Sequence, residues 1–197
     1  KALHLPWRLF SAADCQKVIE EAIRCFGRID GIVNNAGVND GVGLEHGSPE
    51  AFANSIANNL HHYYSLVHFA LPELKKNKGS IVNISSKTAV TGQGGTSGYV
   101  AAKGAQLALT REWAVELLPY QIRVNAILPA EVYTPMYESW IQSFANPEEK
   151  LAEISKRIPL GNRMTKPEEI AAMAIFLLSE KAAHITGQHL YVDGGYT

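Results

Sequence analysis

Short apolar runs alternate with longer stretches of helical periodicity along almost the whole chain, and this alternation constrains the fold more than any other feature. Runs with the length and composition of buried strands occupy residues 29–33, 80–85, 122–128 and 188–192. Strands that alternate with helices form a parallel sheet covered on both faces, and ligands bind at the carboxyl ends of its strands. The sequence therefore predicts an α/β fold built on a doubly wound parallel sheet.

Capping residues indicate where the intervening helices begin and end. Ser11 is placed to cap an amphipathic helix that Gly27 ends. Ser48, followed by a proline and a glutamate, begins a second helix that runs to residue 76, with a kink expected at Pro72. Two further helices are predicted over residues 98–118 and 165–178.

The rest of the chain shows one irregular segment and no boundary between domains. Residues 130–159 lack a clear period and scatter aromatic side chains among polar ones, which suits a mobile lid over a ligand. No repeat, linker or low-complexity tract interrupts the 197 residues. We therefore expect residues 1–197 to form a single domain.

Composition and charge exclude several classes of function. The formal net charge of -1 and the pI near 6.7 provide no electrostatic footprint for nucleic acid or an anionic membrane. No apolar run reaches the roughly 20 residues that span a bilayer. The seven histidines show no metal-ligand spacing, so no metal site is expected. Cys15 and Cys25 lie too far apart on one predicted helix to form a disulfide, which fits a reduced, cytoplasmic protein.

Three residues between positions 86 and 103 have the spacing that proton-coupled hydride transfer requires. Tyr99 and Lys103 would share one helix face, a turn apart, and Ser86 stands at the end of an apolar strand. A free tyrosine titrates at about pH 10, and a protonated lysine beside it lowers its pKa. Ser86 could then hold the reacting oxygen while the phenol transfers its proton. A packed ring beside a solvated amine would produce the same Tyr-x-x-x-Lys spacing by chance.

The motifs around these residues resemble the short-chain dehydrogenase/reductase family. They are Asn-Asn-Ala-Gly at 34–37, Ile-Val-Asn-Ile-Ser-Ser at 81–86, Tyr-x-x-x-Lys at 99–103 and Val-Asp-Gly-Gly at 192–195. The resemblance covers nearly the whole chain and implies a Rossmann-like sheet with NAD or NADP as the cofactor. An oxidoreductase of this kind takes its hydride chemistry from that cofactor.

The resemblance also implies a role for each catalytic residue. Tyr99 would be the general base and Ser86 would position the substrate hydroxyl. Lys103 would lower the pKa of the phenol and hold the nicotinamide ribose, while Asn59 would support the proton relay. Asn58 is the competing choice for the last role, and only its register in the sequence disfavours it.

The cofactor contacts follow from the same resemblance. The implied residues are Asn35, Ala36, Gly37, Tyr99, Lys103, Pro129, Val132 and Thr134. Gly37 would let a flat ligand approach the backbone, although a plain strand-to-loop turn would also use a glycine. Ala130 stands where most members of the family carry glycine, and Arg8 stands where they carry an acidic residue that meets the adenine.

Longer strings at 34–41, 85–93 and 127–135 resemble the L-fucose dehydrogenase-like members of the family. They imply a sugar substrate, an aldose such as L-fucose, whose hemiacetal hydroxyl is oxidised to give a lactone. Each buried hydroxyl of such a substrate needs a hydrogen-bonding partner. The polar residues expected around the pocket are Lys87, Gln93, Glu131 and Tyr133. Solvent exposure is the alternative for Lys87 and Glu131.

Two other functions share these motifs. A 3-oxoacyl-(acyl-carrier-protein) reductase would have the same catalytic residues, but it needs an apolar groove for the acyl chain and a basic patch for its carrier. A non-catalytic dinucleotide sensor or scaffold would have no need of the acid and base that Ser86, Tyr99 and Lys103 provide. The polarity of the pocket therefore separates the two enzymes, and the intact set of three residues argues against the sensor.

Two expectations concern the chain as a whole. Helices 48–76 and 98–118 carry apolar residues on more than one face, which predicts a homotetramer in which they pair across a two-fold axis. No glycine-rich turn precedes Asn34, so we expect the sheet to lack its first two strands and helices. About 60 N-terminal residues of the working enzyme would then be missing from this sequence. Residues 2–6 would correspond to the third strand. We expect either that residues 1–6 are detached from the sheet or that the intact protein has a first segment that its structure does not show.

Overall fold

A four-stranded parallel sheet forms the centre of the molecule. The computed structural model describes residues 2, 4, 5, 9 and 11–197. The strands are β1 (Gly31–Asn34), β2 (Ser80–Ile84), β3 (Arg123–Pro129) and β4 (His189–Val192), and they lie in the order β1-β2-β3-β4. The four predicted strands are confirmed, and their ends differ from the prediction by one or two residues.

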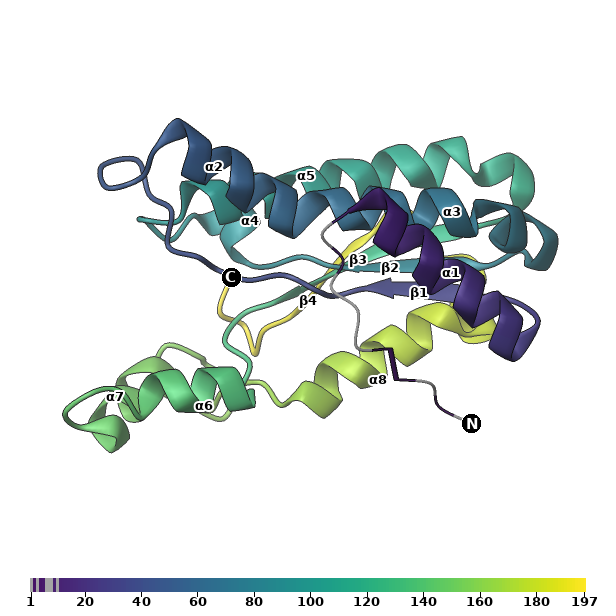
Figure 1. Ribbon diagram of the computed structural model, residues 1–197. Helices are drawn as coiled ribbons and strands as arrows, with labels where there is room; N and C mark the ends of the chain where they lie inside the picture. The colour runs from purple at the N-terminus through teal and green to yellow at the C-terminus, as the bar shows by residue number, and fades with distance from the viewer. Residues whose placement is uncertain (1, 3, 6–8, 10) are drawn as a thin grey trace.

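Helices cover both faces of this sheet. Helices α1 (Ala12–Phe26), α3 (His62–Asn77) and α5 (Ser97–Glu116) lie over one face, and α8 (Pro167–Leu178) lies over the other, as Figure 1 shows. A hydrophobic core lies on each face of the sheet, and neighbouring residues of β2 belong to different cores. Ile81 packs with Leu74 of α3, and Val82 packs with Leu177 of α8. An α/β, Rossmann-like doubly wound sheet is therefore confirmed.

Local chemistry accounts for where most helices begin and end. The Ser11 hydroxyl caps α1 by accepting from the backbone N–H of Asp14, and Gly27 ends the helix in the left-handed conformation at φ 78°. The second predicted helix is present as α2 (Pro49–Ile56), a π-helical turn η1 (Ala57–His61) and α3. Pro72 lies inside α3. The π-helical turn had no signal in the sequence.

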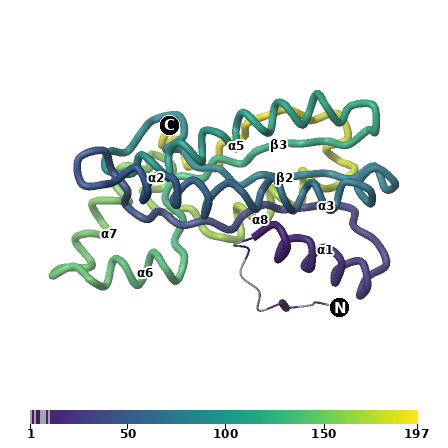
Figure 2. Tube along the Cα trace, turned by 45° about the horizontal axis from the view of Figure 1, so that its top comes forward, coloured from purple at the N-terminus to yellow at the C-terminus, as the bar shows by residue number. Residues whose placement is uncertain are grey.

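The irregular segment forms two short helices, α6 (Pro135–Ile141) and α7 (Pro147–Ser155). Four buried side chains give these helices a small core of their own: Ile141, Ile154, Ile158 and Met164. The two helices lie beyond the carboxyl ends of the strands, on the same side as α2, α4 (Thr88–Thr91) and the C-terminus (Figures 1 and 2). The segment is therefore placed where a lid would lie, and its mobility stays a prediction.

The N-terminal strand predicted over residues 2–6 lies partly outside the described residues. Ala2, His4 and Leu5, which are described, belong to no strand. Within the part of the chain that the structure describes, β1 pairs only with β2, and Val33 is 43% exposed. Among the described helices, none is long and apolar enough to cross a membrane.

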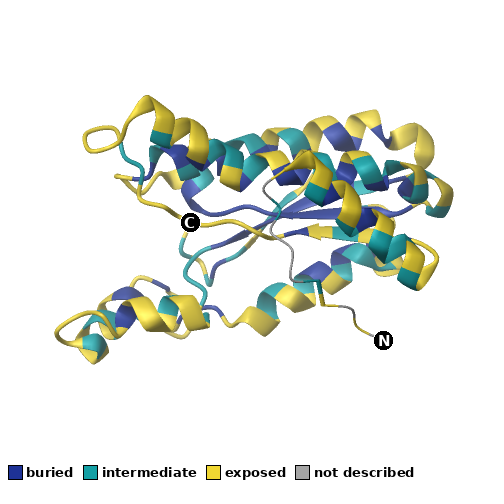
Figure 3. Ribbon diagram, viewed as in Figure 1, coloured by how far each residue is buried: buried dark blue, intermediate teal, exposed yellow. Residues whose placement is uncertain are grey.

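The apolar residues that suggested an oligomer are mostly used inside the chain. Ala102, Leu107, Trp113 and Ala114 of α5 are buried against the sheet and its neighbouring helices. Tyr64, Val115 and Leu118 are instead exposed. Figure 3 shows that each α-helix has exposed residues as well as buried ones.

Candidate active site

The predicted catalytic residues meet at the carboxyl ends of the strands. Ser86 lies just beyond β2, Tyr99 and Lys103 lie in the first two turns of α5, and Asn59 lies in η1. The parallel register places Asn34 of β1 beside Asn83 of β2, so the loops that follow these strands leave the sheet together. The structure thus brings together residues that are distant in sequence.

Lys103 is held almost without solvent beneath this site. Its side chain is 3% exposed, and its Nζ donates to the backbone carbonyl of Ile84 at 2.7 Å. The hydroxyl of Tyr63 donates to the same carbonyl at 2.9 Å. Burial lowers the pKa of Lys103 to about 7, so the amine exchanges a proton close to neutral pH.

In this structure burial, rather than Lys103, is the main influence on the pKa of Tyr99, and the predicted effect of Lys103 stays a prediction. The Lys103 Nζ lies 5.6 Å from the centre of the Tyr99 ring and is directed at the Ile84 carbonyl. Burial is the main influence and raises the pKa of Tyr99, the Ser86 hydroxyl lowers it by hydrogen bonding, and the Glu131 charge raises it. The net direction is upward because desolvation disfavours the tyrosinate.

Ser86 is oriented by its neighbour Thr88. The Ser86 Oγ accepts from the backbone N–H of Thr88 at 3.2 Å and from its hydroxyl at 3.0 Å. Both lone pairs of the serine oxygen are then used, which leaves its proton to donate. Ser86 can therefore donate to a substrate oxygen or to the oxygen of Tyr99.

Asn59 is fully buried, whereas Asn58 is exposed. The Asn59 side chain donates to the Ser55 carbonyl at 2.9 Å and accepts from the Val38 N–H at 2.8 Å. Its backbone carbonyl accepts from Nε2 of Gln106 at 2.8 Å. Of the two asparagines, only Asn59 is therefore placed to influence the centre of the site.

Gly37 explains how the loop after β1 approaches this centre so closely. A Cβ atom at Gly37 would lie 2.9 Å from Oδ1 of Asn59 and 3.7 Å from Nζ of Lys103. The preceding residues Asn35 and Ala36 are exposed, and the Ala36 carbonyl lies 2.9 Å from Nε2 of His62. The glycine is required by close packing.

The other implied cofactor residues lie at the end of β3 and between β3 and α6. Pro129 ends β3, Val132 bridges to Thr165, and the Thr134 hydroxyl caps α6 by accepting from the Tyr137 N–H at 3.2 Å. Arg8 lies outside the described residues. In the described chain, no three histidine, cysteine, aspartate or glutamate side chains gather as metal ligands would.

Lys87 and Glu131 are not exposed to solvent, which was the alternative for both residues in the sequence. Lys87 is 6% exposed and forms an ion pair with Glu131, whose other oxygen accepts from the Tyr137 hydroxyl at 2.6 Å. The Lys87 Nζ also lies 3.6 Å from the centre of the Tyr196 ring. Tyr137 and Tyr196 had no spacing signal in the sequence and were missed.

Gln93 and Tyr133, the remaining predicted substrate contacts, are both exposed. The Tyr133 hydroxyl donates to Oε1 of Glu138 at 3.2 Å. Neither residue takes part in the buried cluster around Lys87. The structure therefore brings together two of the four predicted substrate residues.

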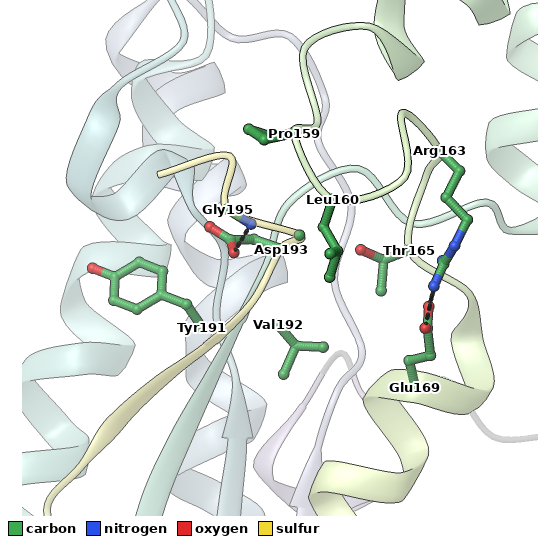
Figure 4. A pocket seen from close by; sticks show the side chains of 10 residues that line it. Pro159, Leu160, Arg163, Thr165, Glu169, Tyr191, Val192, Asp193 and Gly195 are labelled. Atoms are coloured by element: carbon green, nitrogen blue, oxygen red, sulfur yellow. Dashed lines mark hydrogen bonds and ion pairs between the residues drawn. The ribbon is translucent and has the colours of Figure 1, made fainter.

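A cavity near the end of β4 contains none of the predicted catalytic residues in its lining. It has a volume of about 610 Å³ and is lined by residues from the end of β4, the loop before α8 and the start of α8, as Figure 4 shows. Arg163 pairs with Glu169 at its edge, and Asp193 accepts from the N–H groups of Gly195 and Thr197. Thr165 connects its wall to the site, because the Thr165 N–H donates to the Glu131 carbonyl at 2.9 Å.

Comparison with known proteins identifies the family. A family model described as enoyl-(acyl carrier protein) reductase matches residues 9–197. L-fucose dehydrogenase of Rattus norvegicus is 38% identical over 192 residues, which cover 97% of this chain and 70% of that protein. A 3-oxoacyl-(acyl-carrier-protein) reductase of Thermotoga maritima is 37% identical over 181 residues, covering 91% of this chain and 71% of that protein.

Solved structures agree with this assignment. The crystal structure of Cj0485 dehydrogenase superposes with a TM-score of 0.95 at 48% identity, covering 98% of this chain and 74% of that one. The ligand-free aldohexose dehydrogenase of Thermoplasma acidophilum superposes with a TM-score of 0.93 at 33% identity, covering 100% of this chain and 78% of that one. The chain belongs to the short-chain dehydrogenase/reductase family. Within that family it is an NAD(P)-dependent oxidoreductase.

Proposed function

We propose that this enzyme oxidises the hemiacetal hydroxyl of L-fucose or a similar aldose to a lactone. The observation that carries the substrate class is the polar wall beside Ser86, where Lys87, Glu131 and Tyr137 form a connected, largely buried group. Burying charged and hydroxyl groups of this kind against the hydrocarbon of an acyl chain would be costly. A sugar presents hydroxyls that such a wall tolerates. The names of the fucose and aldohexose dehydrogenases support the same class.

The residues present fit a nicotinamide dinucleotide. Lys103 uses one of its N–H groups on the Ile84 carbonyl, so its remaining N–H groups could bind the ribose hydroxyls. The absence of a side chain at Gly37 lets the loop after β1 lie close to Asn59 and to this amine. Asn35, Ala36, Pro129, Val132 and Thr134 would border the cofactor. When bound, the cofactor supplies the hydride acceptor.

In the proposed mechanism the protein moves one proton. Ser86 donates a hydrogen bond to the reacting hydroxyl oxygen, and Tyr99 in its ionised form accepts the hydroxyl proton. Lys103, whose pKa is about 7, can pass a proton onward, and Asn59 keeps η1 in place beside it. The burial that raises the pKa of Tyr99 means that the alkaline side of neutrality favours oxidation.

The proposal extends to the assembled protein. We propose that residues 1–197 belong to one domain that works in the cytoplasm as a homotetramer. Exposed apolar residues on the outer helices, Tyr64, Val115 and Leu118, support assembly, and the free thiols of Cys15 and Cys25 suit a reducing compartment.

A turnover assay tests the proposal. Purified full-length protein is given a panel of aldoses that includes L-fucose, with NAD and NADP in parallel, and formation of the reduced cofactor is followed. We expect L-fucose or a related aldose to have the highest kcat/KM and a lactone to be the product. Efficient reduction of a 3-oxoacyl thioester without turnover of any aldose would support the acyl reductase instead.

A further inference from the structure

Four side chains from four separate parts of the chain meet beside the catalytic serine. Lys87 follows Ser86 directly, Glu131 follows β3, Tyr137 belongs to α6, and Tyr196 lies next to the last residue. Lys87 forms an ion pair with Glu131, the Tyr137 hydroxyl donates to Glu131 at 2.6 Å, and the Tyr196 ring lies over the Lys87 ammonium. We call these four residues the anchor cluster.

The groups of this cluster largely satisfy one another. One carboxylate oxygen of Glu131 is bound by Lys87 and the other by Tyr137. Burial, followed by the hydrogen bond to Glu131, raises the pKa of Tyr137. The Tyr137 hydroxyl therefore keeps its proton and remains a hydrogen-bond donor. Removal of one partner from a buried ion pair leaves an uncompensated charge, which is strongly destabilising. The geometry is therefore that of a joint between segments.

Backbone hydrogen bonds extend this joint in two directions. The Lys87 N–H donates to the Pro129 carbonyl at 2.9 Å, which connects the ends of β2 and β3. The side chain of Asp193 accepts from the N–H groups of Gly195 and Thr197, both at 2.9 Å, and this shapes the turn that carries Tyr196. The anchor cluster thus connects the segment after β2 with α6 and the C-terminal turn.

We propose that Lys87 and Glu131 are positioning residues that fasten α6 and the C-terminal turn to the end of β2 and so maintain the arrangement of Ser86 and Tyr99. This inference rests on the proposed role of Tyr99 as the base, and it does not depend on which sugar is oxidised.

The Glu131 charge of the cluster acts on Tyr99, and Lys87 offsets that charge by pairing with it. The groups that face Tyr99 are Ser86, Glu131, Lys103 and Tyr63, and Glu131 raises the pKa of the phenol. Glu131→Gln removes this negative charge and leaves the Lys87 charge unpaired, so the pKa of Tyr99 falls. Lys87→Met leaves the Glu131 charge unpaired, so the pKa of Tyr99 rises.

The first experiment measures kcat/KM for oxidation as a function of pH in the full-length protein. Activity rises with pH as Tyr99 ionises, so we expect this rise to move to lower pH in Glu131→Gln and to higher pH in Lys87→Met. Glu138→Gln is the matched control, because it removes an exposed carboxylate seven positions further along the chain, in α6. The double variant Lys87→Met/Glu131→Gln carries neither charge, and we expect its profile to lie nearer to that of the wild type.

The second experiment needs no turnover. Trypsin cleavage after Lys150, Lys156 and Arg157 reports how well α7 and the loop after it are held. We expect cleavage to be roughly fivefold faster in Tyr137→Phe, which loses one hydrogen bond to a charged group. Tyr120→Phe, a hydroxyl removal far from the cluster in sequence and half-exposed, is expected to leave it unchanged.

The outcomes separate this inference from the proposed function. Shifts of the pH profile in the same direction for both charge variants, or cleavage equally fast in Tyr137→Phe and Tyr120→Phe, would overturn the anchoring role. Failure to oxidise any aldose would instead overturn the proposed substrate. In that case the cleavage experiment, and a pH profile with whichever alcohol is oxidised, still test the anchor cluster.

Discussion

The inner and outer sides of the candidate active site are held together differently. On the inner side, which comprises Asn59, Ser86 and the first two turns of α5, buried side chains bond mainly to backbone carbonyls. Lys103 donates to Ile84 and Ser85 donates to Lys103, so the fold itself fixes the geometry. On the outer side, residues 130–165, Glu131 is bound to Lys87 by an ion pair, and Tyr137 of the same side donates to the Glu131 carboxylate.

The two sides therefore differ in how far their contacts depend on particular residues. A contact to a backbone carbonyl is available in any chain with the same fold, because every residue carries that carbonyl. A contact between Lys87 and Glu131 exists only where both residues are present. We infer that the inner side supplies the proton transfer common to the family, whereas the outer side distinguishes one substrate from another.

The largest effect is expected when the reacting atom of the inner side is removed. Tyr99→Phe removes the phenol oxygen and keeps the ring, so kcat falls by about 10² to 10⁴, the usual loss when a general base is removed. Cofactor affinity, measured by fluorescence titration of the reduced cofactor, changes little. Retention of more than half of the wild-type rate would be incompatible with Tyr99 as the base.

The sequence was most informative where structure depends on neighbouring residues. The Ser11 cap and the Gly27 terminus of α1 act within one turn of the helix, and both were predicted correctly. The π-helical turn at Ala57–His61 depends partly on Gln106, which binds the Asn59 carbonyl from 47 residues away. No periodicity in the sequence encodes such a contact.

The same limit applies to the active site. The motif of Ser86, Tyr99 and Lys103 could be recognised because its members share one strand end and one helix face. The partners of Glu131 could not be recognised in this way, since Lys87 is 44 residues away and Tyr137 belongs to no motif. Likewise, burial of Lys103 lowers the pKa of the amine, and burial is not visible in a spacing.

The next largest effect is expected from substitutions in the two hydrophobic cores that support the inner and the outer side. Ile81→Ala opens a cavity in the core beneath α3, and Ile154→Ala does so in the small core of the outer side. Each substitution costs about 2 to 5 kcal/mol locally. We expect Ile81→Ala to lower the midpoint of global urea unfolding, and Ile154→Ala mainly to raise the KM for substrate and the trypsin sensitivity of α7. Equal losses of global stability would show that the two sides unfold as one unit.

A smaller effect is expected where the loop after β1 meets the inner side. In Gly37→Ala the added methyl group would lie 2.9 Å from Oδ1 of Asn59, so the loop or the asparagine must move. Such overpacking costs about 1 to 3 kcal/mol, and we expect cofactor binding to weaken roughly tenfold, as measured by titration. Gly104→Ala is the control, because nothing lies within 4 Å of the added atom. Unchanged cofactor binding in Gly37→Ala would show that cofactor binding does not require the loop after β1 to lie so close to Asn59.

The smallest effect concerns the proton on Lys103, the most buried charge of the inner side. Its pKa is about 7 in the folded protein, against about 10.4 in an unfolded chain. Between these values the unfolded chain binds a proton that the folded protein does not, so this group makes the protein more stable as pH rises above 7. We expect the urea midpoint of the wild type, relative to Lys103→Met, to increase from pH 6 to pH 9. The exposed Lys17, changed to methionine, should give a curve parallel to the wild type. A parallel curve for Lys103→Met as well would mean that burial does not displace the proton from this amine.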